Sequence, residues 1–597
     1  MTDISRRDIV AGSAALAFAA ASEPAQAQRR KAPPSPTPSP KQNLINLECK
    51  FKDTVIDNTK VRLRAFNDQI PGPVMKIFPG QTLRINLKNS LPPYDSAAWD
   101  GEHNVPHRLG STNLHLHGMD VIPHLFEPLG TSDPKAPMIE IPPGGSKDYV
   151  FESPRDHPPG FDWYHPHHHG STAVQAVTGM AGGIIVYGAI DEVPAIKAAK
   201  EYLLVMQDIG LFPSEEDANV WTYLPKQNAI WQTFSSDVTI YDPTTKKNVP
   251  TALQGGFTTG DYKLRYYLAN GEAFFKEVHD PKNPTHPTPT QLKPPRFTLA
   301  PGEVVRFRML NACSDNYMPI AVEGHDMHLL ALDGVNFPKV RSIPPTPINT
   351  DPSNEGQIQL APANRAEFMI KASATPGIYR IVQLQQEQQF LFSPEKTIAE
   401  IEVEGRPVTM ALPSALPIPI REYPLIKPNE VQNLRVIYFA DQFPGTQNPY
   451  VGIDFLLNGQ QYDVTQVNYV VDVGAVEEWR LVVGDSQHGG SEGHPFHIHV
   501  NSFEVISVNG KMLEPGTIKD TVWIPAESTV IIRMRFKEFV GKSVFHCHIL
   551  PHEDTGMMQN FLIKKRGQPF PPSIFEPPMH PRLRPLLKTP VGGGHTM

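Results

Sequence analysis

Cysteine is scarce in this sequence. The chain of 597 residues contains only Cys49, Cys313 and Cys547, so at most one disulfide can form within it and a disulfide-dense scaffold is excluded. The sequence leaves open whether Cys49 and Cys313 lie close enough to pair. Cys547 stands directly between two histidines, and it must remain a thiolate if it binds a metal ion.

Runs of like charge and long apolar segments are also missing. The 54 Lys and Arg residues and the 62 Asp and Glu residues give a net charge of −8 that is spread along the chain, which does not indicate a nucleic-acid partner. Beyond the N-terminal region no apolar run approaches the roughly 20 residues that span a bilayer. We therefore expect a mature monomer without a membrane span and without a nucleic-acid ligand.

The first 27 residues have the succession of features that is typical of an export signal. Arg6 and Arg7 precede a short run of apolar and small residues, and the stretch AQA at 25–27 has the small-x-small form of a cleavage site. This looks like a twin-arginine-type signal peptide over 1–27, so we expect a periplasmic or secreted protein. Residues 28–43 follow as a proline-rich linker outside the fold.

Proline, in contrast, is abundant. The 63 prolines are about twice the usual share. Short runs rich in Val, Ile, Phe and Tyr alternate with Pro and Gly turns from about residue 44 to 565, and long helical periods are scarce. This pattern predicts an all-β protein built from β-sandwiches.

A recurring segment indicates three related units. The segment PGQTLRINLKN at 79–89 returns as PGEVVRFRMLN at 301–311 and, more loosely, as VGAVEEWRLVV at 473–483. Each copy is a turn followed by a strand with alternating apolar residues. Composition then predicts three domains with proline-rich segments after the second and third, namely domains at 44–190, 195–405 and 425–567, a linker at 406–424 and a tail at 568–597.

Four His-x-His pairs dominate the chemistry of the first and last units. They are His115 and His117, His165 and His167, His497 and His499, and His546 and His548. In a β-strand, residues i and i+2 point to the same face, roughly 6.6 Å apart. One pair can therefore flank two adjacent metal ions, and eight imidazoles would surround one cluster if the first and last units pack together.

Cys547 lies between the two histidines of the last pair and, by the same alternation, points to the opposite face. There we expect it to meet His494 and His552. Two imidazoles and one thiolate, with Met557 as a weak axial thioether, form the ligand set of a blue-copper electron-transfer site. One strand would then serve two metal sites and connect them through a few covalent bonds.

These histidine segments are similar to the copper-binding motifs of the multicopper oxidases, a laccase-type family, and HCHILPHEDTGMM at 546–558 resembles its bacterial members. The resemblance covers nearly all of the chain after the signal. It implies three cupredoxin-like Greek-key β-sandwich domains and one type 1, one type 2 and two type 3 copper ions. The implied ligands are His494, Cys547, His552 and Met557 for type 1, His115 and His497 for type 2, and His117, His165, His167, His499, His546 and His548 for type 3.

The resemblance also implies an oxidase that couples one-electron oxidation of a reducing substrate to the four-electron reduction of dioxygen to water. Phenols and aromatic amines are the first prediction for the substrate. The alternative is a metal-ion oxidase acting on Cu(I), Fe(II) or Mn(II). Copper-efflux oxidases resemble the chain closely but typically carry a methionine-rich insertion, whereas no methionine occurs here between Met410 and Met512; this counts against Cu(I), which binds soft thioethers.

Two further functions are less consistent with the sequence. A non-enzymatic copper-binding periplasmic protein would carry the same ligands and is separated from an oxidase by measuring oxygen uptake. A two-domain nitrite reductase is disfavoured, because its copper sites do not need four His-x-His pairs.

Acidic residues near the cluster are expected because dioxygen reduction consumes protons. Glu553 follows His552 directly and matches a position that supplies protons on the type 3 side in bacterial family members. Asp133, in GTSDP, resembles the second acidic position, on the type 2 side. The alternative for Glu553 is a hydrogen-bond acceptor that orients a histidine ligand.

Most of the other histidines and cysteines fit structural roles. Strand alternation turns His168 away from the cluster, the family pattern does not require His169, and His325 and His328 belong to no His-x-His pair. Cys49 and Cys313 fit either small buried side chains or a disulfide.

The loop before His494 contains His488 and Glu492, which are candidates for substrate contacts at the type 1 edge. A solvated turn is the simpler interpretation of the same segment.

Overall fold

The computed structural model describes residues 43–93, 101–214, 216–223, 239–242, 247–250, 262–280, 283–345, 357–388, 391–442, 454–484 and 492–569. The predicted signal, nearly all of the first linker and of the tail, and His488 lie outside these residues. The described chain is mostly strand, and its helices are the short segments α1 (Thr172–Ala176), α2 (Pro194–Ala198), α3 (Leu550–Asp554), η2 (Ala189–Glu192), η3 (Ile420–Glu422) and η4 (Pro428–Glu430). Among the described helices, none has the length and apolar character needed to cross a membrane.

The first sandwich packs two sheets around one core. One layer consists of β1 (Asn43–Ile56), β2 (Thr59–Phe66), β4 (Thr82–Asn89) and β6 (Ser146–Glu152), and the other of β3 (Gly72–Ile77), β5 (His115–His117), β7 (Gly160–His165) and β8 (Gly182–Val186). Ile85 and Tyr149 from one layer meet Met75 and Ile184 from the other in a continuous apolar cluster. The alternating burial along β4 follows the alternation predicted from its sequence.

The larger sheet of the middle sandwich continues into the first sandwich through β10, which pairs with β9 on one side and with β2 on the other. This layer consists of β9 (Lys200–Pro213), β10 (Val220–Thr222), β13 (Leu264–Ala269), β14 (Glu272–Asp280), β15 (Asn283–Gln291), β17 (Val304–Asn311), β19 (Met327–Leu332), β20 (Val335–Ile343) and β22 (Arg365–Lys371). The opposite layer consists of β16 (Arg296–Leu299), β18 (Met318–Val322), β21 (Ile358–Leu360), β23 (Gly377–Gln383) and β26 (Lys396–Val403). Two small hairpins complete it, β11 (Thr239–Asp242) with β12 (Lys247–Pro250) and β24 (Gln386–Gln388) with β25 (Leu391–Ser393).

The last sandwich has the same two-layer plan. One layer consists of β27 (Asn433–Gln442), β28 (Asp454–Leu457), β30 (Val476–Val483), β32 (Phe503–Val508), β33 (Lys511–Met512), β34 (Ile518–Lys519) and β36 (Thr529–Arg535). The other consists of β29 (Tyr469–Asp472), β31 (His494–Ile498), β35 (Thr521–Ile524), β37 (Gly541–Cys547) and β38 (Met558–Lys564). Trp479, Phe496 and Phe545 fill the core between the layers.

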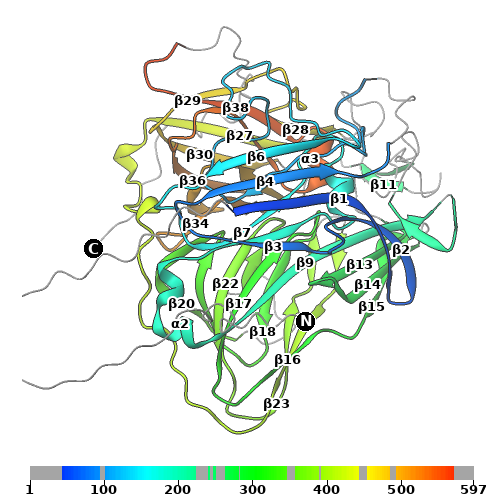
Figure 1. The fold of residues 1–597 in the computed structure, drawn as a ribbon, viewed down its shortest axis with the longest axis vertical. Coiled ribbons are helices and arrows are strands. Elements are labelled where there is room, and N and C mark those ends of the chain that lie inside the picture. The colour runs from blue at the N-terminus through cyan, green and yellow to red at the C-terminus, as the bar shows by residue number, and fades with distance from the viewer. Residues whose placement is uncertain are drawn as a thin grey trace, which may run out of the picture.

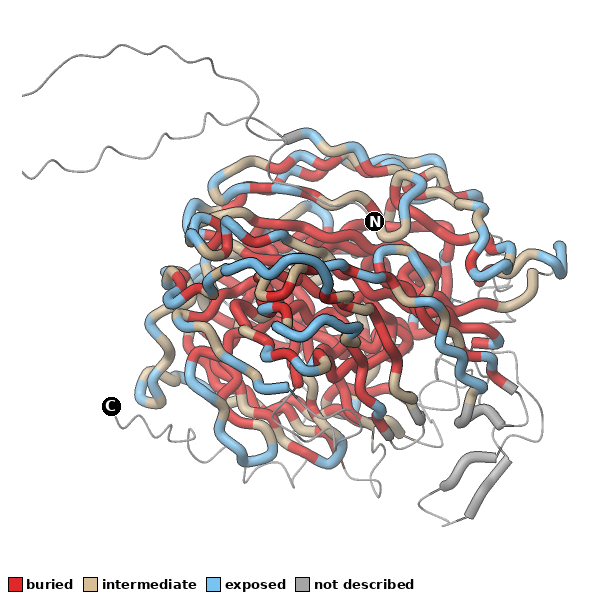
Figure 2. Tube along the Cα trace, turned by 90° about the horizontal axis from the view of Figure 1, so that it is seen from below, coloured by how far each residue is buried: buried red, intermediate tan, exposed pale blue. Residues whose placement is uncertain are grey.

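The three repeated sequence segments occupy equivalent positions in the three sandwiches. They form β4, β17 and β30, and each pairs in parallel with a strand that opens its own unit, namely β1, β9 and β27. Figure 1 shows the middle sandwich in green below, with the blue strands of the first sandwich and the yellow-to-red strands of the last sandwich above it. Buried residues run continuously through the centre of the molecule (Figure 2). The predicted all-β sandwich architecture is confirmed.

Candidate metal centre

Strand pairing within two sandwiches brings the four histidine pairs together. In the first sandwich, β5 pairs with β7 so that His115 lies opposite His165. In the last sandwich, β31 pairs with β37 so that His497 lies opposite His546. Neighbouring strands are about 4.8 Å apart, so each sandwich presents a compact patch of imidazoles.

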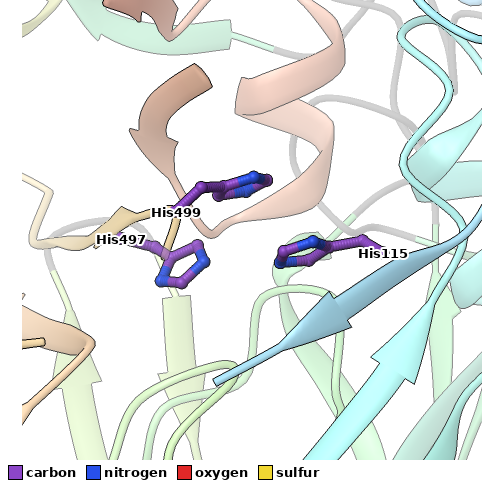
Figure 3. Close-up of side chains that lie close together, drawn as sticks. All are labelled: His115, His497 and His499. Carbon is purple, nitrogen blue, oxygen red and sulfur yellow. The ribbon is translucent and has the colours of Figure 1, made fainter. Parts of the chain in front are cut away.

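The two patches face each other directly. The rings of His115 and His499 stack at 3.9 Å with an interplanar angle of 6°, and those of His117 and His497 stack at 3.8 Å and 14°. Figure 3 shows His115, on its blue strand, pointing toward His497 and His499 from the opposite side. The eight paired histidines therefore form one buried group, called here the histidine cluster.

Three ring nitrogens converge within the histidine cluster. The Nε2 atom of His546 lies 3.1 Å from Nε2 of His167 and 3.2 Å from Nε2 of His499. The Nδ1–H of His546 donates to the carbonyl of Cys547 at 2.9 Å, and a neutral imidazole has only one N–H. Its Nε2 atom therefore presents a lone pair to the other two rings, as a metal ligand does.

Other ring nitrogens of the cluster are buried without a hydrogen-bond partner within the described residues. They are Nε2 of His115, His165 and His497, Nδ1 of His117 and His167, and both nitrogens of His548. A buried polar atom without a partner is costly. A bound metal cation satisfies such nitrogens, so the donor set fits the copper ions that the motifs imply.

Hydrogen bonds on the outer side of the rings fix which nitrogen faces inward. The Nδ1–H groups of His165 and His497 donate to the carbonyls of Pro166 and Asp520, at 2.8 and 2.9 Å. A carbonyl can only accept, so the inward Nε2 atoms are unprotonated. This is the usual arrangement around metal-bound histidines.

His115 is held in the same way by His124, a residue that the motif pattern did not single out. Nδ1–H of His124 donates to the carbonyl of Ile122 at 3.0 Å, and its Nε2 accepts the backbone N–H of Leu116 at 3.0 Å. His115 Nδ1, 3.2 Å from that same Nε2, is therefore a donor. The Nε2 atom of His115 is left free of hydrogen and faces the cluster.

Burial favours the neutral form of seven of the eight cluster imidazoles. It lowers the pKa of His165 and of His497 to about 3. It also lowers the pKa, well below the ordinary value, of His115, His117, His167, His499 and His548. Neutral imidazole is the form that binds metal ions.

Cys547 points away from the histidine cluster into the last sandwich, as strand alternation predicts. Its Sγ atom lies 3.5 Å from Nδ1 of His494 and 4.0 Å from Nδ1 of His552, and it accepts the backbone N–H of Ile549 at 3.4 Å. Burial raises the pKa of the Cys547 thiol, so a thiolate here needs a cation beside it. Met557 is fully buried in the same core, and its carbonyl accepts the Cys547 backbone N–H at 3.0 Å.

Two carboxylates lie on the outer side of this thiolate site. Asp441 Oδ2 is 3.2 Å from Nε2 of His494, and Glu492 Oε2 is 3.9 Å from Nε2 of His552. The side chain of Glu492 keeps 21% of its accessible surface and that of Asp441 keeps 12%, so both are reachable from solvent. Glu492 was a sequence candidate, whereas Asp441 lies in no motif and was missed.

Glu553 lies against the histidine cluster and Asp133 does not. The Glu553 carboxylate is buried, with Oε1 3.2 Å from Nδ1 of His167 and Oε2 3.1 Å from Nδ1 of His546. Asp133 is exposed and accepts the backbone N–H of Lys135 at 2.9 Å in a surface turn. The expectation that Asp133 stands beside the cluster needs correcting, because this turn holds it at the surface.

The remaining histidines make ordinary polar contacts. His168 Nδ1 lies 3.3 Å from Ser171 Oγ, and His169 Nε2 lies 3.2 Å from Asn104 Oδ1. In the middle sandwich, His325 accepts the backbone N–H of Ser373 at 3.0 Å and packs edge-on against Tyr379, while His328 contacts Ser342.

Cys49 and Cys313 are buried free thiols. They lie in the cores of two different sandwiches. The two cysteines are therefore small buried side chains and do not form a disulfide with each other.

Comparisons with known proteins identify the same family over most of the chain. Three sequence models described as "Multicopper oxidase" match residues 109–190, 238–402 and 428–567. The chain is 23% identical over 533 residues to a laccase of Bacillus subtilis, covering 84% of this chain and 90% of the relative. It is also 23% identical over 498 residues to a multicopper oxidase of Staphylococcus haemolyticus, covering 83% and 82%.

A solved structure of a multicopper oxidase from Campylobacter jejuni, described as a metallo-oxidase, shares the fold. Its TM-score is 0.62 at 23% identity, and the match covers 89% of this chain and 93% of that one. The sandwiches described above are therefore cupredoxin-like.

Proposed function

Because the chain belongs to the multicopper oxidase family and is a copper-dependent oxidoreductase that uses dioxygen, we propose that it oxidises small phenols or aromatic amines. The observation that carries this proposal is the pair of carboxylates at the outer edge of the thiolate site. Asp441 and Glu492 reach solvent on one side and the imidazoles of His494 and His552 on the other. Asp441 can accept the hydrogen bond of a phenol or an aromatic amine as a carboxylate. Burial raises the pKa of Glu492 to about 8, and this side chain can accept the same hydrogen bond through its carbonyl oxygen, so either residue can hold the donor next to His494 or His552.

The proposed copper ligands are those that the resemblance to the family implies, and all of them lie in the thiolate site or in the histidine cluster. His494, Cys547 and His552, with Met557 as a further donor from the same core, would hold the type 1 ion. The type 2 ion would take His115 and His497, and the type 3 pair would take His117, His165, His167, His499, His546 and His548. When bound, the four copper ions would supply the one-electron chemistry that links substrate oxidation to dioxygen reduction.

The protein holds the two sites at a fixed short separation. Cys547 is bonded through the backbone to His546 and His548, so one segment of β37 belongs to both sites. The histidine cluster and Cys547 are fully or almost fully buried, which excludes bulk water from both. We propose that Glu553 holds a proton on the carboxylate beside His167 and His546 and delivers it during dioxygen reduction.

A metal-ion oxidase is the second candidate, and the same two carboxylates favour it. Carboxylate oxygens suit Fe(II) and Mn(II), whereas Cu(I) prefers the thioethers that are missing between Met410 and Met512. The Campylobacter jejuni protein is described as a metallo-oxidase, and the Bacillus subtilis relative is named a laccase. The relatives thus support an oxidase and divide on the substrate.

Steady-state oxygen uptake tests the proposal directly. A phenol, an aromatic amine, Fe(II), Mn(II) and Cu(I) are compared for the wild type and for Glu492→Gln, with Glu514→Gln as the control because its side chain is 68% exposed in the same sandwich. We expect the phenol or the amine to give the highest kcat/KM, and Glu492→Gln to raise its KM. A higher kcat/KM for Fe(II) or Mn(II) would establish the second candidate instead.

We further propose the export and the domain limits that the sequence predicts. The twin-arginine-type signal over 1–27 rests on the sequence alone. The matched family segments at 109–190, 238–402 and 428–567 each fall within one of the proposed domains at 44–190, 195–405 and 425–567. Mass spectrometry of the secreted or periplasmic protein tests the first, since the mature chain should begin at residue 28.

A further inference from the structure

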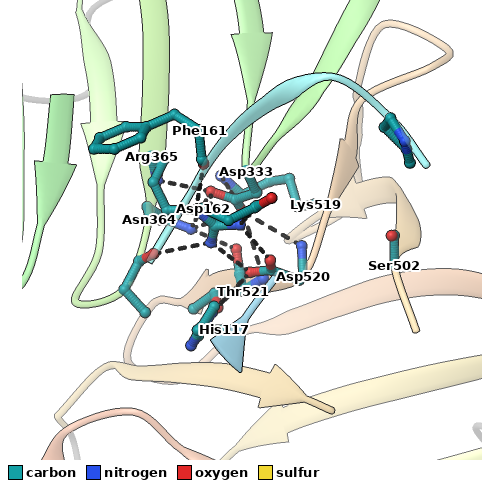
Figure 4. Close-up of polar contacts among 12 residues, drawn as sticks. His117, Phe161, Asp162, Asp333, Asn364, Arg365, Ser502, Lys519, Asp520 and Thr521 are labelled. Carbon is teal, nitrogen blue, oxygen red and sulfur yellow. Dashed lines mark hydrogen bonds and ion pairs between the residues drawn. The ribbon is translucent and has the colours of Figure 1, made fainter. Parts of the chain in front are cut away.

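A network of buried charges lies where the three sandwiches meet. It borders the histidine cluster at His117, whose ring contacts Asp520. Figure 4 shows the side chains of the network converging from all three sandwiches. The network consists of His117 and Asp162 from the first sandwich, Asp333, Asn364 and Arg365 from the middle one, and Lys519, Asp520 and Thr521 from the last. None of the four His-x-His pairs lies in the middle sandwich, yet its residues stand at the centre of this network.

The guanidinium of Arg365 makes five hydrogen bonds, and the residue is fully buried. Its guanidinium donates to both carboxylate oxygens of Asp520, at 2.9 and 2.6 Å, and to Asp162 at 3.1 Å. The other two bonds go to the carbonyls of Phe161 and Ala363, each at 3.0 Å. A bidentate, fully satisfied arginine fixes both the position and the plane of the Asp520 carboxylate.

Asp520 in turn contacts two histidines of the cluster. Its Oδ1 atom lies 3.1 Å from Nε2 of His117, and its backbone carbonyl accepts Nδ1–H of His497 at 2.9 Å. Thr521 adds a hydrogen bond from its hydroxyl to the same Oδ1 at 2.9 Å. With the Nε2–H of His117 directed at Asp520, its unprotonated Nδ1 atom, buried without a partner, faces the cluster.

The backbone beside His117 is fitted closely to this network. Gly118 has a φ of +89°, and a Cβ atom there would lie 2.3 Å from both Arg365 Nη2 and Asp162 Oδ1. Glycine adopts this conformation without strain and leaves room for the guanidinium. The guanidinium of Arg365 therefore packs directly against the backbone of Gly118, the residue that follows His117.

We propose that Arg365 and Asp520 are positioning residues for the histidine cluster. Arg365 clamps the Asp520 carboxylate, and this carboxylate sets the tautomer and the ring orientation of His117. The middle sandwich thereby takes part in building the oxygen-reducing site without supplying a ligand. This inference rests on the proposed role of His117 as a copper ligand.

The same geometry argues against Asp520 as a ligand itself. Both of its carboxylate oxygens accept hydrogen bonds from Arg365, and Oδ1 also accepts one from Thr521. The nitrogen of His497 nearest to the carboxylate is Nδ1, at 3.9 Å, and Nδ1 carries the hydrogen given to the Asp520 carbonyl. Asp520 therefore acts through His117 and His497.

The test compares copper retention in full-length variants. Asp520→Asn presents an amide N–H to either Arg365 or His117. Thr521→Val keeps the shape of the side chain but removes the hydroxyl, which donates to Asp520 Oδ1 and also lies 3.3 Å from Nε2 of His117 and 3.2 Å from Nδ1 of His497. Arg365→Lys breaks the bidentate clamp. Arg308→Lys is the matched control, since Arg308 is also fully buried in the middle sandwich and pairs with Asp191, Glu201 and Glu367.

Copper per chain is measured by mass spectrometry across a chelator series, together with the blue absorption of the Cys547 site and the thermal unfolding of the copper-free protein. Loss of a residue that orients metal-bound histidines typically weakens metal binding by about 10- to 100-fold. We expect Asp520→Asn and Arg365→Lys to lose copper at about 10- to 100-fold lower chelator concentration, and Thr521→Val to show a smaller shift. The blue absorption should stay, and Arg308→Lys should retain its copper.

Copper retention equal to wild type in Asp520→Asn and Thr521→Val would overturn the positioning role. Equal loss of copper from the blue site and the cluster, or equal loss in Arg308→Lys, would also overturn it, since a purely structural role predicts that outcome. Failure of the proposed function is separate: absent copper sites would show in the wild type as missing blue absorption or missing copper, and a different substrate would show only in the oxygen-uptake comparison.

Discussion

Replacing Glu553 with glutamine removes an acidic group that lies beside two histidines at once. The carboxylate is fully buried, with its two oxygens 3.2 and 3.1 Å from Nδ1 of His167 and Nδ1 of His546. Glutamine keeps one acceptor oxygen but turns an N–H group toward the second ring, and it cannot release a proton. The substitution therefore affects both roles considered for Glu553.

The size of the effect depends on which role is lost. Neither Glu553 oxygen makes a hydrogen bond within the described residues, so the expected loss is that of a positioned proton donor, which contributes about 10²- to 10⁴-fold to a rate. If Glu553 carries a proton, kcat should fall by about this factor while copper content and the blue absorption stay the same. If Glu553 only orients the two histidines, copper affinity should fall by about 10- to 100-fold instead.

Oxygen uptake across pH and copper retention in a chelator series distinguish the two outcomes. Glu478→Gln is the matched control, because Glu478 is equally buried in the last sandwich and its carboxylate accepts from Arg533 at 3.0 and 2.9 Å. Full turnover, an unchanged pH profile and unchanged copper retention in Glu553→Gln would refute both roles.

Three further predictions concern the thiolate site and the fold. Cys547→Ser should abolish the blue colour and the oxidase activity while circular dichroism shows folded sandwiches; a variant that stays blue would refute the type 1 assignment. Met557→Leu should raise the type 1 potential in a redox titration, since losing a weak axial donor destabilises Cu(II), and an unchanged or lower potential would point to Met558. Burial lowers the pKa of Lys542 to about 8, so the unfolded chain binds more protons between about pH 8 and 10.5. The thermal midpoint should therefore rise over this range, and Lys542→Met should flatten the rise.

Periodicity predicted the sandwiches and the two faces of β37. The alternation of His546, Cys547 and His548 sends neighbouring residues to opposite sides of a strand, and the structure places Cys547 with His494 and His552, away from the histidine cluster. The three sequence repeats likewise occupy equivalent parallel strands. Such features depend only on local backbone geometry, which a sequence reveals directly.

Contacts between distant segments could not be predicted in the same way. Asp441, His124 and Asp520 each touch a proposed ligand, yet none belongs to a repeated motif, because a single buried side chain leaves no periodic signal. Asp133 shows the opposite failure. Its motif context resembled a functional position, but a local turn keeps it exposed.

The distribution of copper in the folded protein is the direct test of the two proposed sites. Anomalous X-ray scattering recorded on either side of the copper absorption edge locates each ion in crystals of the copper-loaded protein. We predict one peak among His494, Cys547 and His552, and three peaks within the histidine cluster. Copper-loaded crystals with no peak beside Cys547, or with no peaks among the paired histidines, would contradict both the ligand assignment and the oxidase mechanism built on it.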